Sequence, residues 1–316
     1  MKVLANDGIS ETGVSELEAA GFEVNTTRVA QEQLINFINE QGITVLLVRS
    51  ATQVGKDVID NCPTLKLIGR GGVGMDNIQV AYAKEKGLHV INTPAASSES
   101  VAELVFAHLL GGVRFLYDAN RNMPLEGDSK FKQLKKSYAK GSELRGKTLG
   151  IIGFGRIGRA TAKIALGLGM KVIYFDPYIE KGNVQVDFFD GQSVSFNFES
   201  MGKSELLQQA DFITVHVPAQ KEYIIGSKEF DSMKDGVGIV NAARGGVIDE
   251  VALLEYIEKG KVSFAGLDVF ESEPKPEIQI LMHPKISLTP HIGAATGEAQ
   301  DRIGSELATQ IISLLK

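Results

Sequence analysis

Short runs of aliphatic and β-branched residues recur along the chain, and amphipathic stretches with helical spacing separate them. Near-continuous apolar runs of this kind predict strands of a parallel sheet that helices cover on both faces. The runs form two groups, residues 3–5, 43–48, 65–68 and 89–91, and then, after a long helical segment, residues 148–152, 171–175, 212–217, 237–240, 264–268 and 286–289. The pattern therefore predicts an α/β fold built from two doubly wound parallel sheets in tandem.

The boundary between the two predicted domains lies at a turn-rich cluster, PAASS at residues 94–98, which a helical pattern follows. The closing segment comes after the last strand of the second group and is too short for a domain, so we expect it to pack on the first domain. We predict one domain from residues 1–95 with 287–316 and another from residues 96–286. The two crossings would act as hinges of a cleft, where open α/β sheets tend to bind ligands.

Composition and charge narrow the class of protein. With 43% hydrophobic and 23% charged residues, the chain is globular in composition and not disordered. A single cysteine, Cys62, excludes an intramolecular disulfide and a cysteine-based zinc site, and we expect no metal. The amino terminus shows no signal peptide and no apolar run approaches the roughly 20 residues of a membrane span, so we expect a cytoplasmic protein. A formal charge of −6 argues against a nucleic-acid or membrane binder.

A glycine-rich motif, GFGRIG at residues 153–158, follows a predicted strand and opens a predicted helix. In that context Gly153 permits a tight turn, Gly155 lets a pyrophosphate approach the backbone, and Gly158 lets helix and strand pack closely. Asp176 ends the next strand, 23 residues after Gly153, where a carboxylate can accept hydrogen bonds from ribose hydroxyls and repel a 2′-phosphate. The motif and Asp176 therefore predict a site for NAD rather than NADP. The alternative is a glycine-rich turn in some other α/β protein.

Three further polar blocks follow predicted strands of the second domain, at residues 241–246, 266–274 and 289–293. Hydride transfer between NAD and a hydroxy acid needs a cation for the carboxylate, an acid/base that titrates near neutrality, and a group that orients this base. Arg244, His291 and Glu273 fit these roles, because a guanidinium binds a carboxylate in a bidentate manner and an imidazole titrates in the useful range. The alternative for Arg244 is a solvated or paired surface arginine, and the alternative for His291 is a hydrogen-bonded core or surface histidine. By composition, Glu271 competes with Glu273.

With these residues in this order, the chain resembles the D-isomer-specific 2-hydroxyacid dehydrogenase family over essentially its whole length. The resemblance implies a flavodoxin-like substrate-binding domain and a Rossmann NAD-binding domain, with Arg244 as the carboxylate holder, His291 as the acid/base and Glu273, not Glu271, as its partner. It places His216, Val217 and Pro218 along the adenine side and Asp268 at the nicotinamide carboxamide. The full set of implied cofactor contacts is Gly153, Gly155, Arg156, Ile157, Gly158, Asp176, Pro177, His216, Val217, Pro218, Ala242, Asp268 and Gly293.

Within this family, residues 48–52, 69–77 and 100–103 are most similar to the phosphoglycerate dehydrogenases. That similarity implies oxidation of D-3-phosphoglycerate, the entry step of serine biosynthesis, with a phosphorylated 2-hydroxy acid held by Arg49, Ser50, Gly72, Val73 and Gly74. A surface arginine that ends a strand is the alternative for Arg49. A hydroxypyruvate or glyoxylate reductase is the nearest alternative activity, and an NAD-sensing, protein-binding relative is an alternative from another class.

The family also dimerises through a helical arm, which here would run over residues 101–142. Residues 130–140 carry three apolar side chains among five lysines, so a solvated basic helix face is an equal alternative there. The resemblance therefore predicts a homodimer. Because the sequence stops at Lys316, directly after its last predicted helix, we expect no carboxy-terminal serine-binding domain and no feedback control by serine.

Overall fold

The computed structural model describes residues 1–316, which divide into two compact units. Unit 1 comprises Met1–Ser100 and Ala294–Lys316, and unit 2 comprises Val101–Gly293. Both crossings fall a few residues later than the predicted positions near 95 and 287. The second boundary lies after residue 293 rather than near 287 because hydrogen bonds to Asp268 hold residues 289–293 in unit 2.

Unit 1 contains a five-stranded parallel sheet in the order β2-β1-β3-β4-β5, which is the flavodoxin-like order. Its strands are β1 (Lys2–Ala5), β2 (Glu23–Asn25), β3 (Val45–Val48), β4 (Leu67–Arg70) and β5 (His89–Asn92). The sequence pattern did not predict β2, because this three-residue edge strand contains only one apolar residue. Neighbouring residues of the central strands alternate between two apolar cores, one on each face of the sheet.

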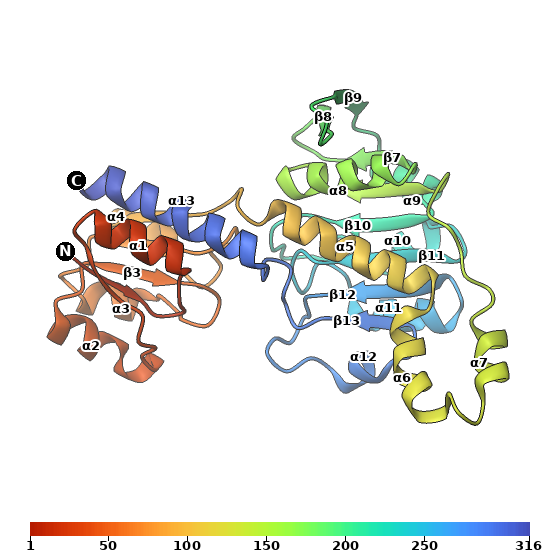
Figure 1. Ribbon diagram of the computed structural model, residues 1–316, viewed down its shortest axis with the longest axis horizontal. Coiled ribbons are helices and arrows are strands. Elements are labelled where there is room, and N and C mark those ends of the chain that lie inside the picture. The colour runs from red at the N-terminus through yellow and green to blue at the C-terminus, as the bar shows by residue number, and fades with distance from the viewer. The chain divides into compact units, whose positions relative to one another are not determined.

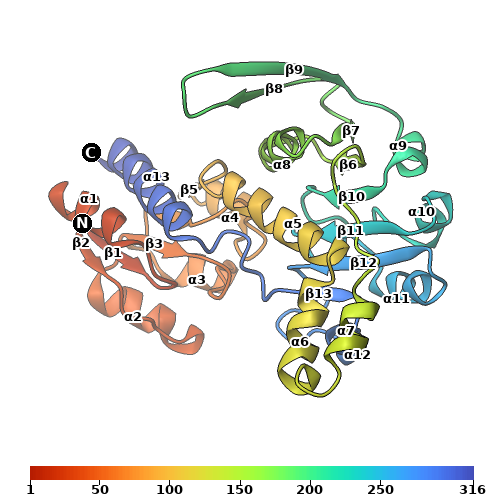
Figure 2. The same ribbon diagram turned by 45° about the vertical axis from the view of Figure 1, so that its right-hand side comes forward.

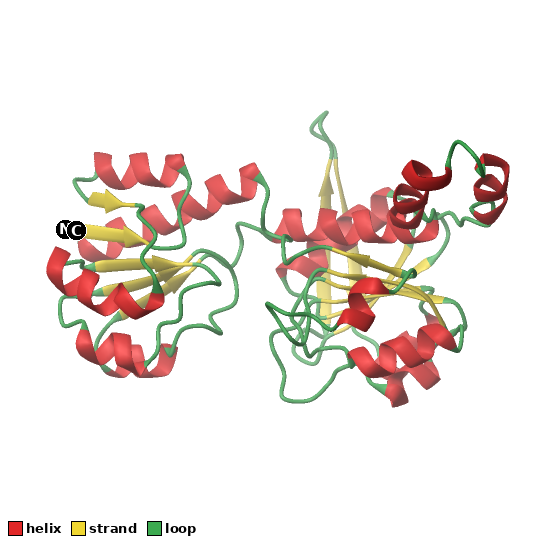
Figure 3. Cartoon of the chain, turned by 90° about the horizontal axis from the view of Figure 1, so that it is seen from below, coloured by secondary structure: helices red, strands yellow, loops and turns green.

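Helices cover both faces of the unit 1 sheet, as Figure 3 shows. They are α1 (Glu11–Ala19), α2 (Leu34–Gln41) with a 3₁₀ turn η1 (Gln31–Gln33) before it, α3 (Lys56–Asn61), α4 (Val80–Glu85) and α13 (Gly297–Leu315).

The last helix, α13, lies beside α1 (Figure 1), so the closing segment packs within unit 1 as the sequence predicted. Glycines allow this approach, since a Cβ on Gly13 would lie 2.8 Å from the Cα of Gly304. Ser305 Oγ also donates a 2.7 Å hydrogen bond to the Glu16 carboxylate. The unit is therefore closed by the two ends of its sequence.

Unit 2 contains a six-stranded parallel sheet in the order β13-β12-β11-β10-β6-β7. All six strands match predicted runs: β6 (Thr148–Ile152), β7 (Lys171–Phe175), β10 (Phe212–Val215), β11 (Val237–Asn241), β12 (Val262–Leu267) and β13 (Ile286–Leu288). The helices packed on this sheet are α5 (Ser98–Val113), α8 (Arg156–Gly167), α9 (Lys203–Gln209), α10 (Ser227–Ser232), α11 (Glu250–Glu258) and α12 (Ile278–Met282). The α/β fold with two parallel sheets is confirmed.

An antiparallel hairpin, β8 (Lys181–Asp187) and β9 (Ser193–Glu199), was not predicted. Its apolar residues alternate with polar ones, so it lacks the continuous apolar runs that mark the buried parallel strands. Figure 2 shows it extending past α8. Its base covers the ring of Phe154, whose centroid lies 5.9 Å from that of Phe198. The hairpin thus packs on the second residue of the glycine-rich motif.

The helical arm consists of α5 and two further helices, α6 (Leu116–Glu126) and α7 (Phe131–Ser137). The helix breaks at Phe115, whose φ of 55° is left-handed. No single helix combines the length and apolar character of a membrane span, and only α5 and α6 together meet that test, with a bend of 57° between them.

Candidate active site

The glycine-rich loop joins β6 to α8, and a different local constraint explains the glycine at each of its three glycine positions. Gly153 has a φ of +94°, and a Cβ there would lie 2.4 Å from the carbonyl oxygen of His216. A Cβ on Gly158 would lie 2.2 Å from the carbonyl oxygen of Gly153. A Cβ on Gly155 would meet nothing within 4 Å, so this part of the backbone, at the amino terminus of α8, is open to a ligand. Close packing at two glycines and open space at the third fit a bound pyrophosphate.

Asp176 follows β7, and its carboxylate lies against the glycine-rich loop. One oxygen accepts a 2.7 Å hydrogen bond from Phe154 N, and the other accepts bonds from Tyr178 N and Ile179 N at 2.8 and 3.1 Å. The half-buried carboxylate therefore ties the loop to the turn after β7, next to the exposed Pro177. A carboxylate oxygen accepts more than one hydrogen bond, so ribose hydroxyls can still bind there.

His216 follows β10, and its imidazole points into unit 2. Its Nε2 lies 3.2 Å from Thr161 Oγ1 and 3.1 Å from Thr214 Oγ1, while Nδ1 is buried without a partner. Burial lowers the pKa of His216 to about 3, so the ring is neutral. The backbone carbonyl contacts the loop at Gly153, and Val217 follows at the same edge of the sheet.

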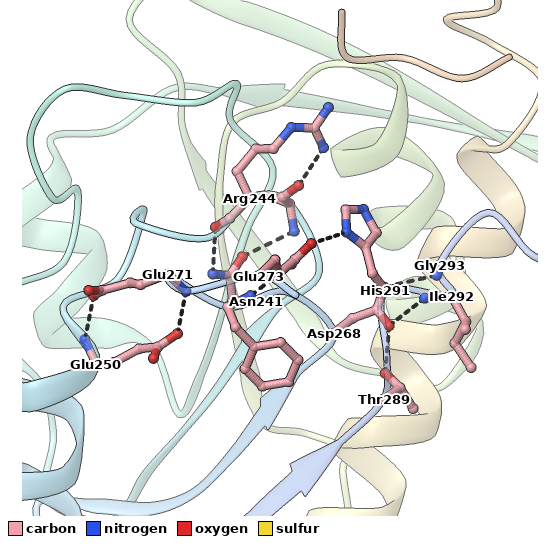
Figure 4. Close-up of polar contacts among 12 residues, drawn as sticks. Asn241, Arg244, Glu250, Asp268, Glu271, Glu273, Thr289, His291, Ile292 and Gly293 are labelled. Carbon is pink, nitrogen blue, oxygen red and sulfur yellow. Dashed lines mark hydrogen bonds and ion pairs between the residues drawn. The ribbon is translucent and has the colours of Figure 1, made fainter. Parts of the chain in front are cut away.

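The structure brings His291 and Glu273 together in unit 2. His291 Nδ1 lies 2.8 Å from Glu273 Oε2, and Figure 4 shows the two side chains facing one another. Glu273 Oε1 also accepts a 3.0 Å hydrogen bond from Phe270 N, so the carboxylate is fixed on both oxygens. About two-fifths of the His291 side chain is exposed, and a pocket of about 390 Å³ opens beside the pair. With Nδ1 facing Glu273, Nε2 is the ring nitrogen left for a ligand.

The backbone at His291 is held in the left-handed region, with a φ of 55°. Three groups of Asp268 hold it there. Its carbonyl accepts from His291 N at 2.8 Å, and its two carboxylate oxygens accept from Ile292 N and Gly293 N, each at 2.8 Å. Thr289 Oγ1 donates a further 2.6 Å bond to that carboxylate, which is almost fully buried. Such strain persists only where the surroundings enforce it, so Asp268 orients the loop that carries His291.

Glu271 has a different role from Glu273, although the sequence composition did not separate them. Glu271 Oε1 accepts from Glu250 N at 3.0 Å, and Glu250 Oε1 accepts from Glu271 N at 2.9 Å. Burial, together with the nearby Glu271 carboxylate, raises the pKa of Glu250. Glu271 therefore fastens the start of α11, and Glu273 is the carboxylate next to His291.

Arg244 lies in the loop after β11, and that loop is tied back to its own strand. Asn241 Nδ2 donates to the Arg244 carbonyl at 2.9 Å, and Asn241 Oδ1 accepts from Ala243 N at 3.0 Å. Gly245 is required beside it, because a Cβ there would lie 1.8 Å from the Phe270 carbonyl oxygen. The buried Ala242 completes the turn. This packing puts the Arg244 loop directly against the segment that carries Glu273.

The other predicted residues lie in unit 1, at the carboxyl ends of its strands. Arg49 and Ser50 follow β3, where Asp7 accepts a 2.7 Å hydrogen bond from Arg49 N. The glycine-rich segment of residues 71–74 follows β4, and it packs on Arg70, which belongs to the block at residues 69–77 but had no predicted role. A Cβ on Gly72, whose φ is +144°, would lie 1.6 Å from Arg70 Nη1. The available signal for Arg70 was a charged residue that ends a buried strand just before glycines.

The family model for the NAD binding domain of D-isomer specific 2-hydroxyacid dehydrogenases matches residues 106–293, more than half of the chain. The chain belongs to the D-isomer specific 2-hydroxyacid dehydrogenase family. Its cofactor is NAD, and the open backbone at Gly155 and the Asp176 carboxylate fit that group.

Among its relatives, a hydroxypyruvate reductase from Thermotoga maritima is 44% identical over 93% of this chain and 91% of that protein. A D-3-phosphoglycerate dehydrogenase from Methanocaldococcus jannaschii is 41% identical over the whole chain. The chain spans 58% of the length of that enzyme. A D-lactate dehydrogenase from Aquifex aeolicus, solved with NAD and lactic acid, matches 98% of this chain and 94% of its own with a TM-score of 0.73 and 29% identity.

Proposed function

We propose that this dehydrogenase interconverts D-3-phosphoglycerate and 3-phosphohydroxypyruvate with NAD, the oxidation being the entry step of serine biosynthesis. The His291–Glu273 pair on its strained loop carries the dehydrogenase chemistry in this proposal. In this proposal Arg49 determines the preference for a phosphorylated substrate, because its guanidinium can bind a phosphate group and gains no ion pair with an uncharged substrate.

In the oxidation, His291 Nε2 accepts the proton of the C2 hydroxyl, and in the reduction it returns that proton. The glycine-rich loop and Asp176 would hold NAD, which would supply the acceptor for the hydride that leaves C2 of the substrate. Glu273 holds Nδ1 of the ring at 2.8 Å and stabilises the imidazolium that forms. Arg244 binds the substrate carboxylate as a bidentate fork, and this interaction fixes which face of C2 is presented.

The second candidate is reduction of hydroxypyruvate. It is favoured by one observation, the 44% identity to a protein with that name over 91% of its length. The two substrates differ by a phosphate group. An arginine–phosphate interaction contributes roughly 1.5–3 kcal/mol, which corresponds to about 10- to 100-fold in kcat/KM.

The test follows absorbance at 340 nm with NADH and 3-phosphohydroxypyruvate, hydroxypyruvate or glyoxylate, and with NAD and D-3-phosphoglycerate in the reverse direction. We expect kcat/KM for 3-phosphohydroxypyruvate to exceed that for hydroxypyruvate by at least about 10-fold. Equal or faster reduction of hydroxypyruvate would establish the second candidate instead. No turnover of any of them would favour an NAD-sensing, protein-binding relative.

We also propose that the enzyme is a homodimer built on the helical arm. Large apolar side chains of this arm are exposed, among them Leu125 at 78% and Phe131 at 56%. Exposed apolar groups clustered on two neighbouring helices are typical of a protein interface. Light scattering at micromolar concentration should therefore give twice the 34.1 kDa mass of the chain, and a monomer mass would contradict the proposal.

A further inference from the structure

A second arginine shares a pocket with Arg49 in unit 1. The pocket has a volume of about 270 Å³ and opens at the carboxyl ends of three neighbouring strands. The loop after β2 contributes Arg28, and the loop after β3 contributes Arg49 and Ser50. Arg28 was not among the residues predicted from the sequence, because it is an exposed residue in a polar loop with no motif around it.

The charge of these two arginines is not cancelled inside the pocket. Asp7 is the acidic residue of the lining, and protein donors occupy both of its carboxylate oxygens. They accept from Arg49 N, Thr52 N and Thr52 Oγ1 at 2.7, 3.0 and 2.7 Å. Neither guanidinium, of Arg28 or of Arg49, forms a hydrogen bond or ion pair within the chain. The pocket therefore contains two guanidinium groups and one carboxylate, and the carboxylate oxygens already accept hydrogen bonds from Arg49 N and Thr52.

The two loops are joined to each other before any ligand binds. Asn6, which is almost fully buried, accepts from Val29 N at 2.7 Å and donates to the Val29 carbonyl at 3.1 Å and to Thr52 Oγ1 at 2.8 Å. Gln31 forms a second reciprocal pair with the backbone of Gln53, with both hydrogen bonds at 2.9 Å. These two amide clamps fix the backbone that carries Arg28 relative to the backbone that carries Arg49. Preorganisation of this kind reduces the entropy that a ligand must offset on binding.

We propose that Arg28 is a specificity residue that binds the phosphate of the substrate together with Arg49. The inference rests on the proposed function, and it adds a residue to the site assigned there. A phosphate monoester carries nearly two negative charges at neutral pH and three acceptor oxygens, so it can bind both forks. A hydroxyl or a hydrogen at that end of the substrate would leave both guanidinium groups without an anion.

The experiment compares the wild type with Arg28→Gln and Arg28→Lys in NADH-dependent reduction of 3-phosphohydroxypyruvate and of hydroxypyruvate. Arg28→Gln should raise the KM for the phosphorylated acid by about 10- to 100-fold with kcat within threefold, and change the KM for hydroxypyruvate by less than threefold. Arg28→Lys should recover part of the loss, since lysine keeps the charge but not the fork. Lys84→Gln, which removes a positive charge elsewhere in unit 1, should change neither KM.

Two results would overturn the proposal: an unchanged KM of Arg28→Gln for the phosphorylated acid, or an equal loss for both acids. Inorganic phosphate separates this proposal from the proposed function. If the wild type reduces only hydroxypyruvate, the proposed function fails. The pocket is then tested by whether phosphate inhibits that reaction competitively and does so at least about 10-fold more weakly in Arg28→Gln. Equal inhibition of the two proteins, or none, would reject the role of Arg28 whatever the substrate.

Discussion

The carboxyl ends of the two parallel sheets are fastened by different side chains. In unit 1, neutral amides form most of these contacts: Asn6 and Gln31 pair with backbone N–H and C=O groups, and Asn77 donates to the carbonyls of Arg49 and Thr52. One carboxylate, that of Asp7, also accepts from Arg49 N and Thr52 N. An amide both donates and accepts, so it joins two loops without adding charge.

In unit 2, carboxylates hold most of the corresponding loops, and the amide of Asn241 holds the Arg244 loop. Asp176 accepts from three backbone amides, Asp268 accepts from two amides and a hydroxyl, and Glu273 accepts from an amide and faces His291. The difference fits the ligands proposed for each edge. Amides leave the arginine charges of unit 1 intact for an anion, whereas carboxylates in unit 2 can also accept from ribose hydroxyls and stabilise an imidazolium.

The largest effect is expected at His291, the proposed acid/base, which the Glu273 carboxylate of unit 2 holds at 2.8 Å. His291→Ala should lower kcat by about 10²- to 10⁴-fold, because general acid–base catalysis is lost while NAD binding is kept. Steady-state kinetics at saturating NADH measures the effect. The matched control is His283→Ala, which removes another histidine paired with a glutamate, 3.1 Å from Glu258 and outside the proposed site. Equal rates for the two variants would remove His291 from the mechanism.

The next effect concerns Asp176, where the carboxylate can be exchanged for the amide type that unit 1 uses. Asp176→Asn should weaken NADH binding by about 10- to 100-fold, since a charge-assisted hydrogen bond to ribose is worth roughly 1.5–3 kcal/mol. Binding of NADPH should weaken less, because the repulsion of its 2′-phosphate is removed. Fluorescence titration with both nucleotides measures this, and Asp190→Asn at the tip of the hairpin is the control. Unchanged NADH affinity would mean that Asp176 only ties the loop.

The smallest effect is on stability in acid, and it should separate the two units. In unit 2, burial lowers the pKa of His108 and lowers that of His216 to about 3. The His216 ring stays neutral in the folded protein at pH 5, whereas the same histidine in the unfolded chain takes up a proton below about pH 6.5, so the free energy of unfolding falls as the pH drops below 6.5. For His216 the loss at pH 5 is about 2 kcal/mol. Unit 1 contains one histidine, the exposed His89.

Urea unfolding followed by circular dichroism at pH 7 and pH 5 measures this loss. His216→Gln should reduce the difference between the two pH values by about 2 kcal/mol, and His89→Gln should leave it unchanged. A difference that is the same in His216→Gln and the wild type would show that the ring is protonated in the folded protein.

The sequence predicted best those features that rest on continuous apolar runs and on glycines with a steric reason. The six strands of the unit 2 sheet and the loop at residues 153–158 belong to this class, because burial on both faces and backbone contact restrict the residues there. The hairpin of β8 and β9 was missed because one of its faces is polar. Arg28 was missed because its importance depends on a partner loop that only the fold brings near.

The choice between Glu271 and Glu273 shows the same limit at the scale of two residues. Both are carboxylates in one turn, and no local pattern distinguishes them. Their roles are decided by hydrogen bonds to residues far along the chain, Glu250 in one case and His291 in the other. The family resemblance supplied that choice in advance, and the contacts give its physical cause.

The pairing of α1 with α13 has a consequence for biosynthesis. A ribosome makes α1 near the start and α13 only after every residue of unit 2, although the two helices meet across Gly13 and Gly304. During translation, unit 2 therefore has all of its sequence available while unit 1 still presents the apolar face that α13 will cover, which includes Leu17. Chains in this state expose a hydrophobic surface of the kind that chaperones bind. Synthesis of unit 1 thus begins before that of unit 2 and is completed after it.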